Sequence, residues 1–236
     1  MQQVPRYWAV IPAAGGGSRM GIDQPKQYVN LRGRSLLEWS LAPFLNLGWI
    51  DGVVLVLARQ DNEFARLPLA RHPRIVTTVG GKARSESVLA GLNIVAERSA
   101  GFSDVRVLVH DAARPCVTLS EIRRLHEEVT DRDGGLLAVP VADTLKRGNQ
   151  ARVTATVDRS ACWRALTPQL FPLRELMGAL QASASNGHDV TDESSAMEQA
   201  GFKPRLVRGL SSNIKVTYAE DLPLAEFFLA QQRPPS

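Results

Sequence analysis

The sequence predicts an α/β protein built on a largely parallel sheet with helices on both faces. Strand-like and helix-like segments alternate along most of the chain, and a glycine-rich loop follows the first strand-like run. Successive parallel strands need a crossover connection, which is usually a helix, so this alternation implies a parallel sheet covered on both sides. One segment breaks the alternation, and its pattern predicts a β-hairpin.

The expected strands are short runs rich in β-branched residues, and the expected helices are amphipathic stretches between them. In chain order, we expect a strand at 8–11 then a helix at 35–45, strands at 52–57 and 75–79 then a helix at 86–95, a strand at 105–109 then a helix at 119–129, a strand at 136–141 then a helix at 173–182, and a strand at 205–207 then a helix at 220–229. The sequence has no internal repeat and no low-complexity segment. We therefore expect a single domain over residues 1–236.

The exceptional segment runs from Asp143 to Arg159, with two strand-like runs around a Gly148-Asn149 turn signal. Its apolar content is thin, and an isolated two-stranded ribbon is marginal in water, so it needs another surface to pack on. We expect an arm over 142–165 that docks on a partner subunit. A hairpin folded back on its own domain is the alternative.

The composition indicates a globular protein with one substantial core, since 44% of the 236 residues are hydrophobic and 22% are charged. The net charge of +4 comes without a run of basic residues that would follow a nucleic-acid backbone, so small phosphorylated ligands are favoured. We find no signal sequence and no uninterrupted apolar span long enough for a membrane helix. With only Cys116 and Cys162 present, both expected as packed or free thiols, a cytoplasmic location is predicted and no membrane partner.

The glycine-rich loop at 12–21 predicts a nucleoside triphosphate site. Three consecutive glycines, Gly15 to Gly17, let the backbone approach an anion and turn its N–H groups inward, while Arg19 and Lys26 add two cations. The loop is neither of the two common nucleotide motifs. A P-loop needs Lys after its second glycine. A ligand-free turn is the alternative on this segment alone.

Two residues in the loop disfavour the common nucleotide motifs. Ile22 stands where a P-loop lysine would follow Gly21, which disfavours P-loop kinases and ATPases. Met20 stands where the third glycine of a dinucleotide-binding fingerprint starting at Gly15 should pack helix on strand, which disfavours dehydrogenases.

Two further sites carry charge. Asp111 follows the apolar strand expected at 105–109, so it lies at the ligand-facing edge of the sheet, where it could bind a ribose hydroxyl, approach a metal ion or simply cap the next turn. Lys215 falls inside a short strand-like run within 211–217 and could be a solvated charge. Asp189 to Glu193 predicts a helix start, from which Thr191 could still point its hydroxyl at a phosphate.

Histidine spacing gives no catalytic signal. His110 beside the strand end is expected to be structural, and none of the other histidines has the spacing of a metal cluster or of a nucleophile's base. We therefore assign no protein metal ligand, although Asp111 is the one candidate to touch a metal's coordination shell.

Taken together, these motifs carry a resemblance that runs nearly from end to end of the chain. They are Pro12-Ala13-Ala14-Gly15 through Arg19-Met20, Pro25-Lys26-Gln27-Tyr28, Gly80-Gly81 with Arg84 and Ser87-Val88, Val109-His110-Asp111-Ala112-Ala113-Arg114-Pro115, Asp143-Thr144 with Lys146, Thr167-Pro168-Gln169, Thr191-Asp192-Glu193 and Asn213-Ile214-Lys215-Val216-Thr217. In these motifs the chain resembles the 2-C-methyl-D-erythritol 4-phosphate cytidylyltransferase family of the non-mevalonate isoprenoid pathway.

The resemblance implies a Rossmann-like nucleotidyltransferase fold and transfer of CMP from CTP to methylerythritol 4-phosphate with release of pyrophosphate. It also implies Mg²⁺ as cofactor and a homodimer formed through the hairpin arm. A phosphate monoester, with its second pKa at about 6, is mostly a dianion at neutral pH and needs no general base, which agrees with the lack of a Ser-His or Cys-His pair.

The resemblance also implies roles for individual residues. Around the triphosphate it places Arg19, Lys26 and Lys215 as the catalytic cations, with Gly15 and Gly17 in the loop. Around the nucleoside it places Ala13, Ala14, Gly81 and Ser87 at the cytosine, and Asp111 and Ala112 by the ribose and α-phosphate. Around the sugar phosphate it places Thr144, Arg159, Thr167 and Thr191 with Arg114 and Lys146 nearby, and in the family Arg159 and Thr167 reach the site from the neighbouring subunit's arm.

Three alternatives remain open from the sequence. A nucleotidyltransferase acting on another alditol phosphate, such as ribitol 5-phosphate, would share the glycine loop and Lys215. A nucleotide-binding regulatory module would bind CTP without turnover. An α/β protein whose arm only mediates assembly would not bind CTP.

Overall fold

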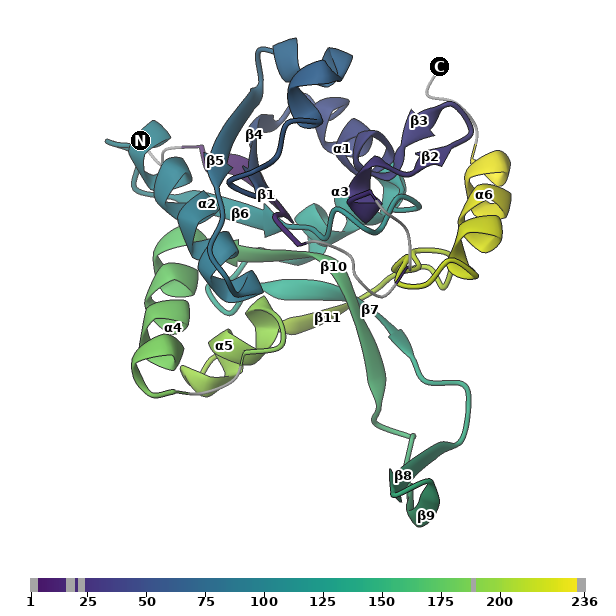
Figure 1. The fold of residues 1–236 in the computed structure, drawn as a ribbon. Coiled ribbons are helices and arrows are strands. Elements are labelled where there is room, and N and C mark those ends of the chain that lie inside the picture. The colour runs from purple at the N-terminus through teal and green to yellow at the C-terminus, as the bar shows by residue number, and fades with distance from the viewer. Residues whose placement is uncertain (1–3, 16–19, 21–23, 188–189, 233–236) are drawn as a thin grey trace.

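The computed structural model describes residues 4–15, 20, 24–187 and 190–232, and this part of the chain forms one seven-stranded sheet with two small hairpins beside it. The sheet has the order β11-β7-β10-β6-β1-β4-β5, and every neighbouring pair is parallel except that β10 runs antiparallel to both of its neighbours (Figure 1). Its strands are β1 (Arg6–Ala13), β4 (Ile50–Leu57), β5 (Ile75–Val79), β6 (Val105–Val109), β7 (Gly135–Pro140), β10 (Trp163–Pro172) and β11 (Arg205–Arg208).

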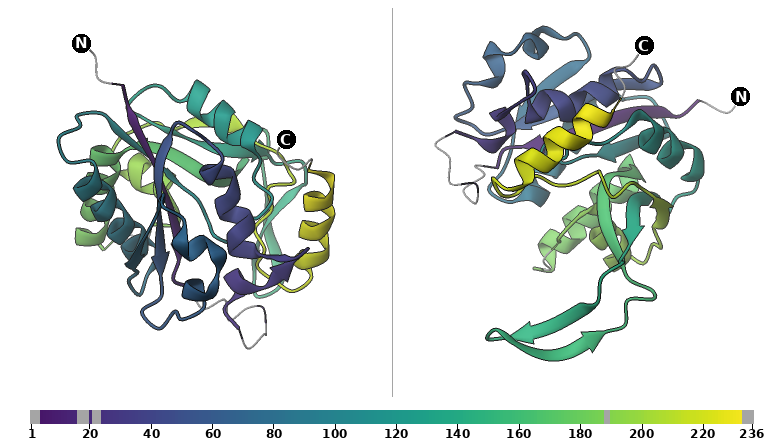
Figure 2. Two further views of the ribbon diagram at one scale, coloured as in Figure 1. Left: turned by 90° about the horizontal axis from the view of Figure 1, so that it is seen from above. Right: turned by 90° about the vertical axis from the view of Figure 1, so that its right-hand side faces the viewer.

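Helices cover both faces of the sheet, as the alternating pattern predicts (Figures 1 and 2). One face packs against α1 (Leu36–Leu45) and α3 (Leu119–Glu128), and the other against α2 (Arg84–Arg98), α4 (Leu173–Ser185) and α5 (Glu193–Gln199). The remaining elements are α6 (Asp221–Gln231), the hairpin of β2 (Asn30–Leu31) and β3 (Arg34–Ser35), and the short 3₁₀ turns η2 (Lys26–Tyr28), η3 (Phe64–Arg66) and η4 (Pro68–Arg71).

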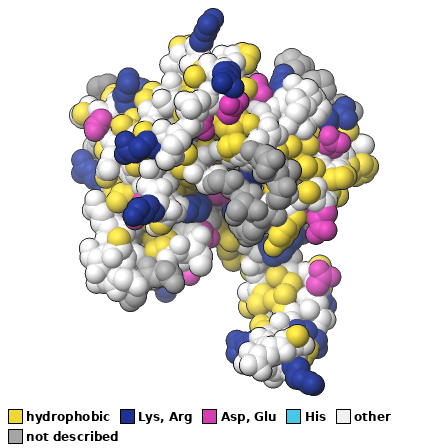
Figure 3. Space-filling view, viewed as in Figure 1, with side chains coloured by type: hydrophobic (Ala, Val, Ile, Leu, Met, Phe, Trp, Pro, Cys, Tyr) yellow, Lys and Arg dark blue, Asp and Glu magenta, His cyan; other side chains and the backbone are white. Residues whose placement is uncertain are grey.

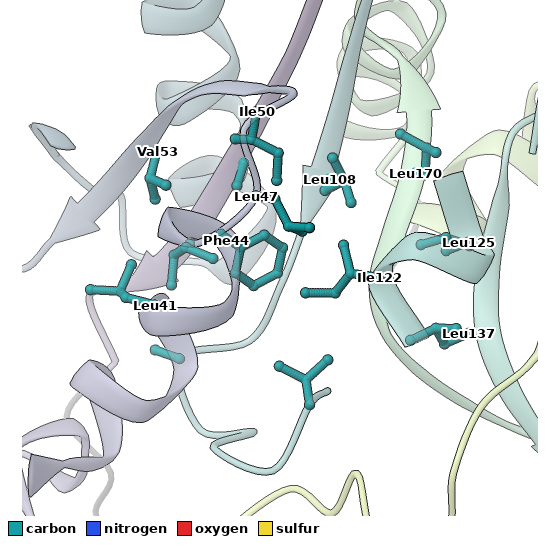
Figure 4. Packing of buried hydrophobic residues seen from close by; sticks show 14 of the residues in the cluster. Leu41, Phe44, Leu47, Ile50, Val53, Leu108, Ile122, Leu125, Leu137 and Leu170 are labelled. Carbon is teal, nitrogen blue, oxygen red and sulfur yellow. The ribbon is translucent and has the colours of Figure 1, made fainter. Parts of the chain in front are cut away.

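The two cores follow from the alternation of side chains along the central strand β1. Ala9 and Ile11 point into the cluster under α1 and α3, whereas Trp8 and Val10 point into the cluster under α2 and α4. Figure 4 shows the first cluster, where Phe44 of α1 lies among leucine and isoleucine side chains from the sheet and from α3. Each such fully buried side chain stabilises the fold by about 1.5–3 kcal/mol.

Local capping fixes where two of the covering helices begin. The hydroxyl of Ser35 accepts from the backbone of Glu38 at 3.2 Å, and the Glu38 carboxylate accepts from the Ser35 backbone at 2.8 Å. Thr118 and Glu121 make the same reciprocal pair at the start of α3. These capping boxes satisfy amide groups that a helix leaves without an internal partner.

The chain direction across the sheet places a ligand site between β1 and β6. From β1 the chain moves outward through β4 to β5, then crosses back to form β6 on the other side of β1. The segments that leave the carboxyl ends of β1 and β6 therefore diverge, and ligands of open α/β sheets bind at such a switch point.

Most of the expected elements are confirmed, but two segments differ from the prediction. β10 was not expected, because Pro168 lacks an amide donor and argues against a central strand. The structure accommodates it with a shift of register in the ladder with β7 between Ala165 and Gln169. Residues 163–165, which we expected in the arm, pair with β7 in the main sheet. The prediction of a strand around Lys215 is wrong, since residues 214–217 belong to no strand.

The arm is a hairpin of β8 (Leu145–Asn149) and β9 (Arg152–Val157) that projects from the body instead of folding back on it (Figures 1 and 2). Its turn lies later than the Gly-Asn signal predicts: Asn149 pairs with Arg152, so Gln150 and Ala151 form the loop, with φ of 46° and 60°. Figure 3 shows Lys and Arg side chains gathered at its end.

Candidate active site

A cleft of about 240 Å³ opens at the carboxyl ends of β1 and β6, where the sheet topology predicts a ligand site. The lining residues that the structure describes come from five segments, namely 12–15, 26–27, 81–84 with 87, 111–113 and 215. Among them are four basic side chains and one carboxylate, listed here as Lys26, Lys82, Arg84, Lys215 and Asp111. The cleft therefore carries an excess of positive charge, which suits a polyphosphate ligand.

Two glycines allow the loops around the cleft to approach one another. A Cβ atom on Gly80 would lie 2.6 Å from Ser87 Oγ and 2.7 Å from Ala14 Cβ. A Cβ atom on Gly81 would lie 2.4 Å from a carboxylate oxygen of Glu86, which itself accepts hydrogen bonds from the backbone before α2. The absence of side chains at these two positions thus lets the start of α2 pack against the loop after β1.

Asp111 lies at the centre of the charged groups. Lys215 Nζ is 2.9 Å from Asp111 Oδ2, Arg84 NH2 is 3.1 Å from Asp111 Oδ1, and Arg114 Nε is 3.6 Å from Asp111 Oδ2. Burial by itself would raise the pKa of Asp111, but Arg84, Lys215 and Arg114 outweigh it and hold this pKa well below its usual range. Asp111 is therefore a carboxylate at neutral pH.

Arg84 joins this aspartate to a second, fully buried carboxylate. Its guanidinium contacts both oxygens of Glu193, at 2.6 Å and 3.0 Å, in a bidentate pair. Burial lowers the pKa of Arg84, but Glu193 and Asp111 outweigh it, and the pKa is raised. Burial raises the pKa of Glu193, although Arg84 opposes this shift.

A neutral histidine supports Asp111 from behind. His110 is buried, and its Nε2 lies 3.2 Å from the carbonyl of Arg114, which can only accept, so Nε2 carries the proton. Nδ1 then accepts from the Thr167 hydroxyl at 2.9 Å, and that hydroxyl accepts from the Asp111 amide at 3.1 Å. Burial lowers the pKa of His110 to about 4, so the ring stays neutral at pH 7.

The segment that carries Lys215 is held by contacts from distant parts of the chain. The Asn213 side chain donates to the carbonyl of Thr167 at 2.9 Å, Arg114 donates to the carbonyl of Asn213 at 2.8 Å, and Val216 donates to the carbonyl of Ala113 at 2.8 Å. These bonds replace a β-ladder and fix Lys215 beside Asp111.

Lys26 reaches the same region from η2. Its Nζ lies 3.4 Å from the carbonyl of Val216, and its neighbour Gln27 donates to the carbonyl of Ala13 at 2.9 Å. Because Gln27 is buried, it anchors η2 to the end of β1 and places Lys26 at the cleft.

The structure brings most of the predicted nucleotide-binding residues together. The predicted residues that line the cleft are Ala13, Ala14, Gly15, Lys26, Gly81, Ser87, Asp111, Ala112 and Lys215. Gly17 and Arg19 lie outside the described residues.

The residues predicted to bind the sugar phosphate are dispersed within this chain. Thr144, Lys146 and Arg159 are exposed on or beside the arm, and Thr191 is exposed just before α5. Arg114 and Thr167 are buried behind Asp111 and do not line the cleft. The family resemblance implied that Thr167 belongs to the arm. In the structure it lies in β10 instead and contacts His110 of its own chain.

Sequence reasoning left several lining or supporting residues out of the predicted site, chiefly Lys82, Arg84 and Glu193. Arg84 and Glu193 both stand in motifs that carry the family resemblance, which is the one signal that could have drawn attention to them. Their pairing spans 109 positions of the chain, so no local pattern predicts it.

The cleft offers little to a metal ion held by protein alone. In the described residues no group of three or more His, Cys, Asp or Glu side chains could hold a metal ion, and Asp111 is the only acidic side chain among the described lining residues. Mg²⁺ keeps several waters and is usually bound through one or two carboxylates plus substrate phosphates, so a site with a single carboxylate fits that mode.

None of the described helices is long and apolar enough to cross a membrane.

Comparison with known proteins gives one consistent result. The sequence model of the family described as 2-C-methyl-D-erythritol 4-phosphate cytidylyltransferase matches residues 7–231. The chain is 49% identical to the 2-C-methyl-D-erythritol 4-phosphate cytidylyltransferase of Tolumonas auensis, over 96% of this chain and 97% of that protein. It is 47% identical to the protein of the same name from Haemophilus influenzae, over 95% of this chain and 97% of that protein.

Solved structures agree with the sequence comparison. A crystal structure of 4-diphosphocytidyl-2C-methyl-D-erythritol synthase superposes with a TM-score of 0.83 at 37% identity, covering 96% of this chain and all, 100%, of the other. The 2-C-methyl-D-erythritol 4-phosphate cytidylyltransferase of Francisella tularensis superposes with a TM-score of 0.81 at 34% identity, covering 94% and 99% of the two chains.

Proposed function

The chain belongs to the 2-C-methyl-D-erythritol 4-phosphate cytidylyltransferase family, and we propose that the cleft around Asp111 and Lys215 is the active site in which it works. The enzyme transfers CMP from CTP to 2-C-methyl-D-erythritol 4-phosphate, giving 4-diphosphocytidyl-2-C-methyl-D-erythritol and pyrophosphate in isoprenoid precursor synthesis. The observation that carries the assignment of the site is the convergence of basic side chains on one carboxylate at the switch point of the sheet.

Each wall of the cleft has a separate task in this proposal. The loop at 13–15 and the turn at Gly81 and Ser87 hold the nucleoside, where the backbone comes close and few side chains intrude. Lys26 and Lys215, with Arg19 of the loop, neutralise the triphosphate. Asp111 orients Lys215 through their 2.9 Å contact and lies beside the ribose and α-phosphate.

The transfer needs charge neutralisation more than acid–base chemistry. A phosphate oxygen of the acceptor forms a bond to the α-phosphorus, the bond from the α-phosphorus to the bridging oxygen breaks, and pyrophosphate leaves with that electron pair. The acceptor phosphate is already mostly a dianion at neutral pH, since its second pKa is about 6. Its repulsion from the triphosphate, about 4 kcal/mol for unit charges roughly 4 Å apart at an effective dielectric of about 20, must be overcome by cations.

Mg²⁺ completes the proposed site. Its donors would be mainly phosphate oxygens and water, with Asp111 the one candidate side chain to touch its shell, and when bound it would supply positive charge to the phosphate oxygens. We also propose a cytoplasmic location, which the two free cysteines support.

The acceptor half of the site is proposed to form between two subunits. Thr144, Lys146 and Arg159 project on the arm, whose strands are almost fully exposed in the single chain. A homodimer in which each arm lies over the partner's cleft would bring these side chains to a sugar phosphate, with exposed Thr191 contributed from the body and Arg114, buried behind Asp111, supporting that aspartate. This arrangement would also cover the exposed hairpin, which is marginal alone.

Pyrophosphate release tests the proposed function. The purified enzyme is given CTP and Mg²⁺ with 2-C-methyl-D-erythritol 4-phosphate, with ribitol 5-phosphate or with no acceptor. We expect release only with the first acceptor. Release with ribitol 5-phosphate alone would move the function to another alditol phosphate, and CTP binding without release would indicate a regulatory module.

A further inference from the structure

We propose that Glu193 is a positioning residue for cytidylyl transfer. It fixes Arg84, Arg84 holds one oxygen of Asp111, and the other oxygen of Asp111 holds Lys215 at the cleft. The inference rests on the proposed function of the cleft, and it extends the site to a side chain that does not line the cleft.

Glu193 is held in place at the first turn of α5. The helix begins with a capping box in which Asp192 accepts from the Ser195 backbone at 2.9 Å. Gln169 of β10 donates to Asp192 at 2.8 Å and accepts from the Ser194 backbone at 2.8 Å, which ties the start of α5 to the sheet. The side chain of Glu193 is only 1% exposed, so its carboxylate has a fixed position.

Arg84 is clamped between two carboxylates. NH1 and NH2 contact the two oxygens of Glu193 at 2.6 Å and 3.0 Å, while Nε and NH2 contact Asp111 Oδ1 at 3.2 Å and 3.1 Å. A bidentate pair fixes orientation as well as distance, so Glu193 fixes the plane of the guanidinium. The guanidinium in turn fixes the position of the Asp111 carboxylate.

The clamp leaves the second oxygen of Asp111 for Lys215, with Arg114 Nε farther away at 3.6 Å. Lys215 Nζ lies 2.9 Å from Oδ2, while Oδ1 is occupied by Arg84. If Glu193 lost its charge, Asp111 would be the only carboxylate left to Arg84 in this cluster, and the guanidinium would compete with Lys215 for it. The ammonium would then be displaced from the position in which it meets the triphosphate.

A purely structural role is the competing explanation, in which Glu193 only neutralises a buried arginine. The two explanations differ in what happens to Lys215. A structural defect lowers the amount of folded enzyme and acts independently of Lys215, whereas a positioning defect disappears once Lys215 has been removed, because residues that act as one unit are not additive.

The test is a double-mutant cycle on kcat with Glu193→Gln and Lys215→Ala. We expect Glu193→Gln alone to lower kcat about tenfold or more with the KM for CTP within about threefold, because misplacement of a group by a remote change costs up to about 100-fold. In the Lys215→Ala background, the same change should lower kcat by less than about twofold.

Glu198→Gln is the matched control, because it removes another carboxylate from α5. The Glu198 carboxylate accepts from the Ser194 hydroxyl at 2.6 Å and does not contact Arg84. This variant should keep wild-type kcat. Glu193→Asp keeps the buried charge and provides a second variant if Glu193→Gln fails to fold. Its shorter side chain cannot hold the same bidentate geometry, so its kcat should also fall, and the fall should also vanish without Lys215.

Two results overturn the positioning role. One is wild-type kcat in a folded Glu193→Gln or Glu193→Asp enzyme, and the other is independent effects of the Glu193 and Lys215 substitutions. Neither result affects the proposed function, which fails separately if the wild-type enzyme releases no pyrophosphate from CTP with 2-C-methyl-D-erythritol 4-phosphate.

Discussion

At the scale of single residues, the proposed active site is arranged around one aspartate that is surrounded by basic side chains. The pKa of Asp111 is lowered because Arg84, Lys215 and Arg114 outweigh the effect of burial. This arrangement keeps a negative charge at the floor of a cleft that is otherwise basic, and it gives the flexible side chain of Lys215 a definite position. The lysine can then meet the triphosphate without first paying the full entropy of ordering its four-carbon stem.

Substitution of the cleft lysines tests this role of charge. Lys26→Ala or Lys215→Ala should lower kcat by roughly 10²–10³-fold, by analogy with removal of one donor from an oxyanion hole. The far-ultraviolet circular dichroism spectrum should remain that of the wild type, because both side chains lie at the cleft and not in the core. Activity within twofold of wild type in either variant would exclude that lysine from the reaction.

The buried histidine predicts a pH dependence of stability. The pKa of His110 is about 4 in the folded protein, below its ordinary value, so the unfolded chain binds a proton more readily. Stability is therefore fully present above about pH 6.5 and is lost as pH falls toward the folded pKa, by about 3 kcal/mol in total.

Urea denaturation at several pH values between about 4 and 7 measures this loss. His110→Asn, which does not titrate, should show a flatter pH dependence of the free energy of unfolding. Equal slopes for the two proteins would mean that folding does not lower the pKa of His110. The other histidines remain in both proteins and cancel in the comparison.

At the scale of elements, the arm shows how a turn can depart from its sequence signal. The hairpin register places Gln150 and Ala151 in the two-residue loop, and both adopt positive φ, which costs non-glycine residues about 1 kcal/mol or more. The Gly148-Asn149 pair that predicted the turn lies in β8 instead, where Gly148 marks a shift of register. The pairing of the two strands therefore determines where the turn lies, and the turn falls two residues after the Gly-Asn pair that predicted it.

A better turn sequence should stabilise the arm. Replacement of Gln150 and Ala151 by Asn and Gly gives the residues that two-residue hairpins with positive φ prefer. We expect about 1 kcal/mol or more of local stabilisation, seen as slower amide hydrogen exchange in β8 and β9. The control places the same Asn-Gly pair two residues earlier, through Gly148→Asn together with Asn149→Gly. This variant should not slow amide hydrogen exchange.

At the scale of the whole molecule, the described chain brings together the residues proposed to bind the nucleotide but disperses those proposed to bind the acceptor. The cleft gathers residues from the loop after β1 to Lys215, whereas Lys146 and Arg159 project on the exposed arm (Figure 1). The shared site of the proposed homodimer would account for both observations. It predicts that an isolated subunit binds CTP yet lacks part of its acceptor site.

Complementation tests the shared site. Light scattering should give twice the mass of one chain at micromolar concentration. Lys26→Ala and Arg159→Ala enzymes, each poorly active, should regain part of the activity when mixed and allowed to exchange subunits, because some heterodimers then contain one intact site. A mixture no more active than the sum of its parts, despite subunit exchange, would place both residues in the same subunit's site.

The amino-acid pattern alone predicted the class of fold and the segments that line the proposed nucleotide site. Hydrophobic periodicity located the parallel strands and their helices, since burial on both faces of a sheet leaves a strong local pattern, and the glycine loop and Asp111 follow strand ends. The family motifs then gave the reaction.

The connections among the charged groups become visible only in the folded chain. The contact of Arg84 with Glu193, the use of the Thr167 hydroxyl by His110 and Asp111, and the antiparallel insertion of β10 all join positions far apart in the chain. Periodicity and turn signals report only the nearest residues along the chain. Pairings of this kind are set by the packing of whole elements, so no local pattern contains them.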